Sequence, residues 1–301
     1  MSAQQERFGE LRSLLMGKQS SYQWNKICRL LDQWDEDDYF LNVVLPYAVD
    51  YLKGWPHDIR LAPQRWVKCA IGGEPTYRMQ IATKLSCSRK KFSDKKLCAL
   101  FSQPGVASIT EAVLNDNYAG ASFVDVLIGS AYTSNIKKLD LQHNRLGSTA
   151  VRVLVQSDWF AHVEVLEIAN MLVKDGQDLL AITAYLDAFD HPSCANLKRL
   201  NVSWTCVEGD DFLTFVQSEH LQNLVELEMV GLGTDDATRW SAVFEQLQGA
   251  PMFSRLEWFT FQSFALGEDA YENLLIEGQF KEEVLKTLSA CIEDPIYWKT
   301  Q

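Results

Sequence analysis

The sequence lacks any apolar run long enough to cross a bilayer, because no stretch approaches roughly 18 uninterrupted apolar residues. It also lacks a signal-peptide pattern. The first residues, MSAQQERFGELRS, carry charges where such a peptide needs an apolar segment. We therefore expect a soluble cytoplasmic protein that has no membrane partner.

The sequence also lacks the short motifs of common catalytic and cofactor sites. Neither G-x-G-x-x-G nor a P-loop follows any expected strand, and H-E-x-x-H and G-x-S-x-G are missing. The five histidines are scattered, and the one nearest a carboxylate, His143 beside Asp140, stands on an expected open surface where acid and base groups gain little. We expect no cofactor, no metal site and no enzymatic activity.

The number and spacing of the cysteines do not indicate a disulfide framework. There are seven cysteines, an odd number, and none forms C-x-x-C or a zinc-ligand spacing with histidine. Free cysteines are among the most buried residue types. We expect reduced thiols with structural roles.

What the sequence does have is an internal repeat. The segment IKKLDLQHN follows a template Leu-x-x-Leu-x-Leu, and matching segments begin at Ala82, Ile109, Ile136, Val163, Leu197, Leu224 and Leu256. Successive starts are separated by 27, 27, 27, 34, 27 and 32 residues. Such a fixed period indicates a solenoid, in which each repeat buries its apolar side against its neighbours.

Each repeat combines two periodicities. Apolar residues at template positions four and six alternate as in a short strand with one buried face, such as Leu139 and Leu141. Helical spacing follows, as in Val151, Leu154 and Val155. The fold class expected is therefore α/β, with parallel strands on a concave face and helices on the convex face. An ordinary α/β domain is the alternative, but it rarely repeats a fixed period.

These repeats resemble leucine-rich repeats of the longer strand-plus-helix type found in ribonuclease-inhibitor-like proteins. The likeness covers roughly residues 82–290 and is most specific in IKKLDLQHNRLGSTAVRVLVQS, LKRLNVSWTCVEGDDFLTFVQS and LVELEMVGLGTDDA. The connecting segments are similar to those of bacterial members in which a small helical region precedes the repeats. The family's asparagine ladder survives only at Asn117 and Asn144, since Met171, Thr205, Leu232 and Phe264 take its place, and this leaves the strand register after Val163 less certain.

Residues 1–81 do not follow the repeat template and have helical periodicity instead. We expect them to form a helical N-terminal cap domain, followed by an array at 82–301 that includes a C-terminal cap. Helices are expected over 5–16, 22–31, 36–51 and 64–70, with Trp24, Trp34, Trp55 and Trp66 in their core. The acidic tract at 35–38 is interpreted as a solvated helix start. The proline-flanked tract GWPHDIRLAPQRW predicts a rigid bend that covers the first repeat.

Charge is divided unevenly along the chain. Residues 82–152 hold ten basic and five acidic side chains, whereas 153–301 hold eight basic and twenty-five acidic ones. The basic run RKKFSDKK at 89–96 invites a nucleic-acid interpretation, but a sequence pI near 4.9 opposes phosphate binding and no nucleic-acid motif accompanies the run. We expect no nucleic acid, and a protein partner whose charge complements a basic first half and an acidic second half.

The template positions that point away from the core predict the residues of the concave surface. The candidate partner-binding residues are Lys137, Lys138, Asp140, His143, Glu164, Glu167, Lys198, Arg199, Trp204, Glu226, Glu228, Glu257 and Trp258. The two tryptophans stand out, because interface hot spots are rich in large aromatics. A register error of one residue in the later repeats would bury both. The acidic groups at Asp140, Glu167 and Glu228 form part of one lateral row, which is costly unless Arg or Lys opposes it.

The function that the sequence favours is a noncatalytic module that binds an unidentified protein on its concave face and is a monomer before the complex forms. The alternative is a regulatory subunit or effector whose helical head modulates a target enzyme that the repeats select. The identity of the partner does not follow from the sequence.

Overall fold

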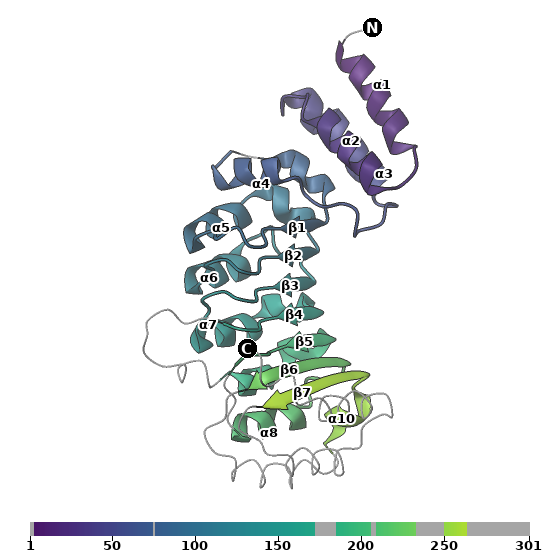
Figure 1. Cartoon of the computed structure of the whole chain (residues 1–301). Helices are drawn as coiled ribbons and strands as arrows, with labels where there is room; N and C mark the ends of the chain where they lie inside the picture. The colour runs from purple at the N-terminus through teal and green to yellow at the C-terminus, as the bar shows by residue number, and fades with distance from the viewer. Residues whose placement is uncertain (1–2, 75, 172–184, 206–208, 233–249, 264–301) are drawn as a thin grey trace, which may run out of the picture.

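A computed structural model describes residues 3–74, 76–171, 185–205, 209–232 and 250–263. Its centre is one seven-stranded parallel sheet in which the strands follow one another in chain order, β1 to β7. The strands are β1 Lys84–Ser86, β2 Glu111–Val113, β3 Lys138–Asp140, β4 Val165–Glu167, β5 Arg199–Asn201, β6 Glu226–Leu232 and β7 Trp258–Ser263. The stack of strands runs along the length of the molecule (Figure 1).

The repeat register expected from the sequence is confirmed. Leu85 pairs with Ala112, Ala112 with Leu139, Leu139 with Leu166, Leu166 with Leu200, Leu200 with Leu227, and Leu227 with Phe259. All seven of these side chains are at most 1% exposed. The register therefore holds beyond Val163, and the steps of 34 and 32 residues leave the pairing unchanged up to a bulge between Met229 and Leu232.

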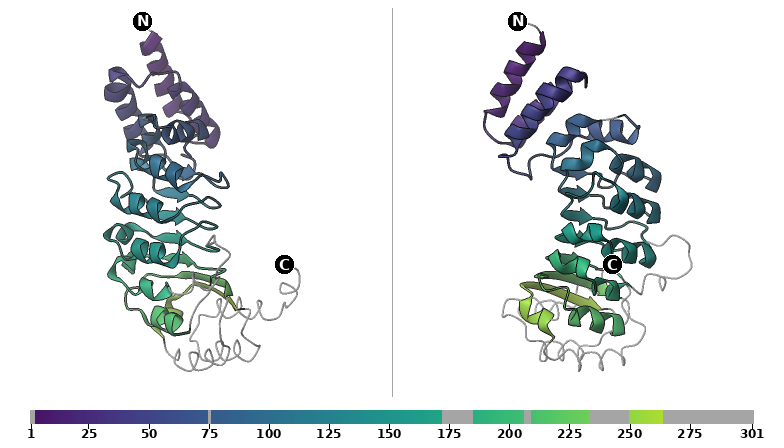
Figure 2. Two further views of the ribbon diagram at one scale, coloured as in Figure 1. Left: turned by 90° about the vertical axis from the view of Figure 1, so that its left-hand side faces the viewer. Right: turned by 180° about the vertical axis from the view of Figure 1, so that it is seen from behind.

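Short helices cover one side of the sheet and leave the other side open. The α-helices of the repeats are α5 Asp94–Phe101, α6 Ala121–Gly129, α7 Ser148–Val155, α8 Gly209–Gln217 and α10 Pro251–Arg255. Short 3-10 helices lead into the strands at Pro104–Ser108, Asp158–His162, Leu186–Phe189 and Pro192–Asn196. Figures 1 and 2 show α5, α6 and α7 stacked along the convex side, with the strands on the opposite, concave side.

The core lies between the strands and the helices as one continuous apolar cluster that runs from the head to β7. Phe101 of α5 and Phe123 of α6 make an edge-to-face contact with ring centroids 5.2 Å apart, so neighbouring repeats bury their aromatic side chains against each other. Neither a strand nor a helix of one repeat has enough apolar contact alone, which is why the repeats are stable only as a stack.

Two asparagines form an internal ladder beneath the turns that follow the strands. Asn144 Nδ2 donates to the carbonyls of Leu114, Leu141 and Gln142, and its Oδ1 accepts from the Ala119 N–H. Asn117 makes the equivalent set of bonds one repeat earlier. At the equivalent place in a later repeat, Thr205 Oγ1 donates to the Val202 carbonyl alone. The ladder therefore weakens where the asparagine is lost, as the sequence indicates.

A second set of asparagines joins repeats at the other end of the strands. Asn135, Asn196 and Asn223 each precede the first apolar residue of a repeat, and each donates from Nδ2 to a carbonyl of the preceding repeat. The acceptors are Ala107, Ala161 and Ala195, at 2.6, 2.8 and 2.7 Å. Each of these bonds joins two neighbouring repeats, whether or not the internal ladder has an asparagine there.

The head, by which we mean residues 3–81, consists of helices packed before β1. They are α1 Ala3–Leu15, α2 Ser21–Leu31, a π-helical turn Phe40–Val44, α3 Leu45–Leu52, α4 Gln64–Ile71 and a 3-10 turn Tyr77–Ile81. Trp24, Trp34, Trp55 and Trp66 are all at most 3% exposed, which confirms that they form its core. The first three α-helices lie toward the strand side of the stack (Figures 1 and 2).

The bend between the two prolines covers the first strand, as expected. Leu61 forms a parallel bridge with Lys84, and the Ala62 N–H donates to the Lys84 carbonyl at 2.8 Å. Trp24 Nε1 of the head donates to the Leu61 carbonyl at 2.9 Å. The edge of β1 is thereby paired by head backbone and is not left open to other strands.

The interpretation of the acidic tract as a solvated helix start is wrong for Glu36. Its carboxylate accepts from the Tyr77 and Arg78 backbone N–H groups and from Arg78 Nε at 2.7 Å. Arg78 also lies 3.7 Å from Asp32, which pairs with Arg65. This network ties the end of α2 to the segment that enters β1. No local pattern indicates it, because its members lie up to 46 residues apart.

The expected C-terminal cap, together with Phe264 of the ladder, lies outside the described residues. Within the described ranges, Cys28, Cys69, Cys87, Cys98 and Cys194 are free thiols, and burial raises the pKa of Cys87 to about 12. No helix in the described part of the chain is both long and apolar enough to pass through a membrane.

Candidate protein-binding surface

The predicted surface residues lie in lateral rows across the strands, on the side of the sheet opposite the helices. Cα pairing places Lys138, Arg199, Glu226 and Trp258 in one row, and Asp140, Glu167 and Glu228 in the next row. Lys137, Glu164, Lys198 and Glu257 immediately precede the strands, whereas His143 and Trp204 follow them. The sheet thus brings residues from five repeats onto one face.

The row that precedes the strands is internally paired. Glu164 lies between two lysines, with Lys137 Nζ at 2.9 Å and Lys198 Nζ at 2.8 Å. Hydrogen bonds from Lys198 and then Lys137 lower the pKa of Glu164. Beside this triplet, Asn135, His162 and Asn196 help to line a surface hollow of about 530 Å³. Two lysines share one carboxylate, so the triplet carries one net positive charge.

The row through Asp140, Glu167 and Glu228 is acidic and only partly compensated. Arg199 Nε lies 2.8 Å from Glu167 Oε1, and Arg199 Nη1 lies 3.1 Å from Glu226 Oε2. Glu228 accepts a neutral hydrogen bond from Asn201 Nδ2 at 3.1 Å. Burial, with the charge of Glu167, raises the pKa of Glu228. Arg199 is the cation that pairs with this row, and it does not balance all three carboxylates.

Asp140 has the most strongly shifted carboxyl of this face. Burial raises its pKa to about 6, and the nearby Glu167 carboxylate adds to the increase, although the Gln142 N–H that Asp140 accepts at 3.0 Å lowers it. Desolvation and a like charge both disfavour the ionised form. Near neutral pH the carboxylate is thus ionised at a cost in free energy.

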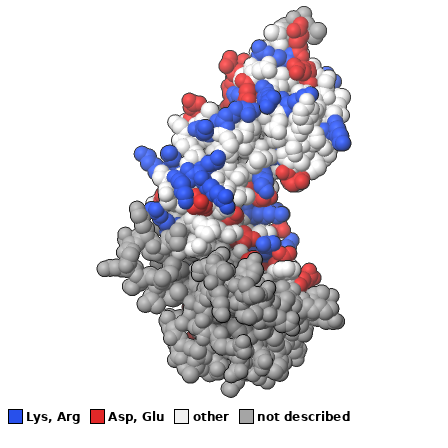
Figure 3. All heavy atoms as spheres, in the orientation of Figure 1, with Lys and Arg blue, Asp and Glu red and all other residues white. Residues whose placement is uncertain are grey.

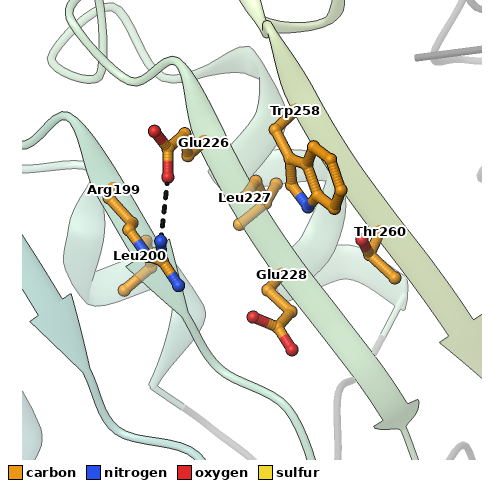
Figure 4. Close-up of a pocket in the computed structure, with 7 residues that line it drawn as sticks. All are labelled: Arg199, Leu200, Glu226, Leu227, Glu228, Trp258 and Thr260. Carbon is orange, nitrogen blue, oxygen red and sulfur yellow. Dashed lines mark hydrogen bonds and ion pairs between the residues drawn. The ribbon is translucent and has the colours of Figure 1, made fainter. Parts of the chain in front are cut away.

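A hollow of about 360 Å³ opens between β5, β6 and β7. Figure 4 shows Trp258 beside Leu227, with Glu226 and Glu228 projecting from the neighbouring strand. The hollow is lined by Arg199, Leu200, Glu226, Leu227, Glu228, Trp258 and Thr260. Trp258 is 53% exposed, so the indole forms an accessible wall of the hollow.

A second hollow of about 390 Å³ adjoins the first toward β2. The two share Arg199 and Glu228, and the second adds Asp140 and Glu167. Asn201 and Thr260, which line these hollows, are missing from the sequence-based candidates. They occupy the same template position as Asp140 and Glu167. The repeat register alone would therefore have predicted that they lie on the open face of the sheet.

The edge that follows the strands has an unusual backbone. Arg89, Asp116, His143, Asn170 and Trp204 occupy one equivalent position of successive repeats, and all have positive φ, between 51° and 59°. This left-handed conformation is uncommon for residues with a side chain and is an outlier for a bulky one. Trp204 is nevertheless 44% exposed. Its indole is therefore presented at the rim of the sheet.

The basic run at 89–96 lies in the turn after β1 and the start of α5. Arg89, Lys90, Lys91, Lys95 and Lys96 are all exposed there, and Lys91 pairs with Asp116. Figure 3 shows Lys and Arg side chains gathered over this part of the molecule. This patch lies at the opposite end of the array from the two tryptophans and their carboxylates.

The parallel strands follow one another in chain order, and each of the seven has a buried apolar residue at the same position of the repeat. The chain has the fold of a leucine-rich-repeat solenoid. No family model and no curated protein matches the sequence of this leucine-rich-repeat chain.

Solved structures superpose on this leucine-rich-repeat protein weakly. An internalin from Listeria monocytogenes has 11% identity and a TM-score of 0.36, over 64% of this chain and 50% of its own. The match thus spans half of that internalin. The actin-binding site 2 of leiomodin-1 has 8% identity and a TM-score of 0.30, over 79% of this chain and 97% of its own. The tropomodulin C-terminal domain of Caenorhabditis elegans has 12% identity and a TM-score of 0.31, over 78% and 98%.

Within the described ranges, no group of three or more histidine, cysteine, aspartate or glutamate side chains is arranged to hold a metal ion. Asp140 lines one of the two hollows of the sheet face, and His143 stands in the turn that follows the same strand.

Proposed function

We propose that this leucine-rich-repeat protein is a noncatalytic recognition module that binds a protein partner on its concave sheet face. The observation that carries the proposal is the exposure of Trp204 and Trp258 on that face, at 44% and 53%. Exposed tryptophans that lie beside hollows and charged rows have the composition of interface hot spots. The predicted partner-binding residues are the rows described above.

The head supports this function as a cap. We propose that residues 1–81 are the cap domain and residues 82–301 the array. The network of Asp32, Glu36, Arg65 and Arg78 joins segments within the head, and the segment at Leu61 pairs the edge of β1. A head that is braced internally and paired with the first strand favours a structural role over that of an independent effector of an enzyme.

The charge distribution supports a partner of mixed polarity. Exposed lysines and arginines gather near β1 and α5, and carboxylates outnumber cations in the hollows of β3 to β7. A partner with the opposite arrangement of charge would be steered into one orientation on the sheet. We further propose that the protein is a monomer before it binds this partner.

The test compares two double variants of the intact chain as affinity baits in native lysate. Trp204→Ala/Trp258→Ala removes the two concave indoles. Tyr22→Ala/Val153→Ala removes two large apolar side chains that are 70% and 42% exposed, on α2 and α7. We expect the native chain and the second variant to recover the same protein, and the first variant to lose it. Equal recovery by both variants would contradict the proposed surface.

A further inference from the structure

The two adjoining hollows of the sheet have an excess of negative charge. Five carboxylates line them, from Glu111, Asp140, Glu167, Glu226 and Glu228, whereas two cations do so, from Lys138 and Arg199. Arg199 is engaged by Glu167 and Glu226, and Glu111 pairs with Lys84. The carboxylates with no ion pair to another described residue are therefore Asp140 and Glu228, one at each end of the acidic row.

We propose that these hollows dock an extended, arginine- or lysine-bearing segment of a protein partner, with one cationic side chain between Trp258 and Glu228 and a second on Asp140. This inference rests on the proposed function and names the chemistry of the segment that the sheet face receives. It assigns separate roles to the indole and to the two carboxylates.

The first position suits a cation because it combines an aromatic face with negative charge. Trp258 pairs with Glu226 across β6 and β7, and Glu228 stands two residues farther along β6, so the three side chains rise from the same side of the sheet. Figure 4 shows the indole and the Glu228 carboxylate at the same hollow. Tryptophan is the best aromatic partner of a cation, and a nearby carboxylate strengthens the attraction. Leu200 and Leu227 supply apolar contact for the methylene groups of the guest side chain.

Arg199 does not fill this position. Its guanidinium contacts Glu167 and Glu226, on the side of the hollow nearer β4. Figure 4 shows Arg199 and Glu226 joined, with the Glu228 carboxylate projecting separately. The arginine of the protein thus forms ion pairs with two carboxylates, and it attracts Glu228 only at longer range, which leaves that carboxylate accessible to a cation from outside.

The second position follows from strand spacing. Asp140 on β3 and Glu228 on β6 belong to the same lateral row, and they are three strands apart. At about 4.8 Å per strand, the separation is about 14 Å. An extended chain covers this distance in about four residues, and residues four apart point to the same side. The spacing therefore selects a pattern of two basic residues with three residues between them.

The hollows favour a segment of a protein over a small cation. They are open and adjoining, and they extend across the strands from β2 to β7. A compact polyamine would find no enclosed cavity, whereas an extended chain can contact the row along its whole length. Binding of this kind places the main chain of the partner across the strands and its cationic side chains toward the sheet.

The experiment uses the intact chain and a fluorescein-labelled peptide, Gly-Arg-Gly-Ser-Gly-Arg-Gly, titrated by fluorescence anisotropy at low ionic strength. A second peptide has glutamine in place of both arginines. The variants are Glu228→Gln, Asp140→Asn and Trp258→Leu, all on the open face, so the core is unchanged. The matched control is Asp125→Asn on α6, which removes one exposed charge from the convex side.

We expect the arginine peptide to bind and the glutamine peptide not to bind. Each variant of the sheet face should raise the dissociation constant about threefold to tenfold, because each removes one charge or cation–π contact, and Asp125→Asn should leave it within about twofold. Equal weakening by Asp125→Asn would reduce the binding to general attraction by an acidic protein and overturn the inference. Competition by spermidine as strong as that by the peptide would also overturn it.

The same variants separate this inference from the proposed function. If the lysate partner is lost with Trp204→Ala/Trp258→Ala but is retained by Glu228→Gln and not displaced by the arginine peptide, the sheet face binds a protein through other chemistry. The proposed function then stands and the basic segment is refuted. If the partner is also retained by the tryptophan variant, the concave surface itself is refuted.

Discussion

Arg199 Nε lies 2.8 Å from Glu167 Oε1, in the neighbouring strand. The carboxylate side chain is 13% exposed and the arginine side chain 44%. The pair therefore stands where solvent screening is incomplete, and it is central to the charge balance of the sheet face.

Removal of this arginine should destabilise the fold through the carboxylate it leaves behind. We expect Arg199→Gln to lower the free energy of unfolding by about 1–2 kcal/mol, since Glu167 would remain largely buried beside like charges. In Glu167→Gln/Arg199→Gln the cost should be smaller, because no uncompensated charge remains. Chemical denaturation of the native chain, both single variants and the double variant gives the coupling energy. A coupling of zero would show that the pair is dispensable.

Asp140 should make stability depend on pH. Its pKa in the folded chain, about 6, is higher than the ordinary value of 3.8, so the folded state favours the protonated form. The native chain should thus lose stability as the pH rises from about 4 through 6. Asp140→Asn should stabilise it by about 1–2 kcal/mol at pH 7.5, after allowance for solvent screening, and by much less at pH 4. Unfolding measured at both pH values checks this, with Asp125→Asn as the control for a lost surface charge. A gain that is equal at the two pH values would contradict the assignment.

The internal packing of the head should depend on Glu36. We expect Glu36→Gln to lower the unfolding free energy by about 2 kcal/mol, because Arg78 and two backbone N–H groups lose a charged acceptor in a half-buried site. Asp50→Asn offers a contrast, since its ion pair with Lys53 is exposed and should contribute less than about 0.5 kcal/mol. Thermal and urea unfolding measure both changes. Similar small effects for the two variants would mean that the network does not hold the segments of the head together.

The internal ladder should be asymmetric along the array. Asn144→Ala should lower the free energy of unfolding by about 3 kcal/mol, because three carbonyls and the Ala119 N–H lose their buried hydrogen-bond partner. Thr205→Ala removes one bond to the Val202 carbonyl and should cost about 1 kcal/mol. Urea denaturation of both variants ranks the two positions. A larger loss from Thr205→Ala would reverse the described decline of the ladder.

The left-handed positions offer a conformational test. Arg89 has a φ of 56°, and Lys90 beside it is not among the residues with positive φ. Glycine adopts positive φ freely, so Arg89→Gly should be neutral or stabilising by up to about 1 kcal/mol. Lys90→Gly should destabilise by about 0.5–1 kcal/mol, since it only adds freedom to the unfolded chain. Urea unfolding of these adjacent exposed substitutions isolates the backbone effect, and the reverse order would rule out strain at Arg89.

Much of the repeat geometry could be predicted because it is local. Alternation at Leu139 and Leu141 identifies a half-buried strand, and a constant period then fixes which residues are neighbours across the sheet. The exposed side of the sheet follows from the same register. The same register also predicts that Asn201 and Thr260 lie on this side, since they share a template position with Glu167 and Glu228.

The rest depends on contacts between distant residues. Glu36 reaches Arg78 only after distant segments of the head have packed together, and Arg199 contacts both Glu167 and Glu226, which lie on the strands on either side of it. The asparagines that precede the repeats, such as Asn135 and Asn223, recur in the sequence but give no local sign of their acceptors. Periodicity specifies the positions of side chains, whereas packing decides their partners.

The register of the sheet is maintained although Val165 and Arg199, paired across β4 and β5, are separated by 34 residues instead of 27. The seven additional residues between these strands therefore leave the lateral rows of the sheet aligned. The length of chain between two strands and their alignment across the sheet are thus separate properties of this fold. We expect that a short insertion in a connection that lies away from the sheet would leave the rows of the concave face in place.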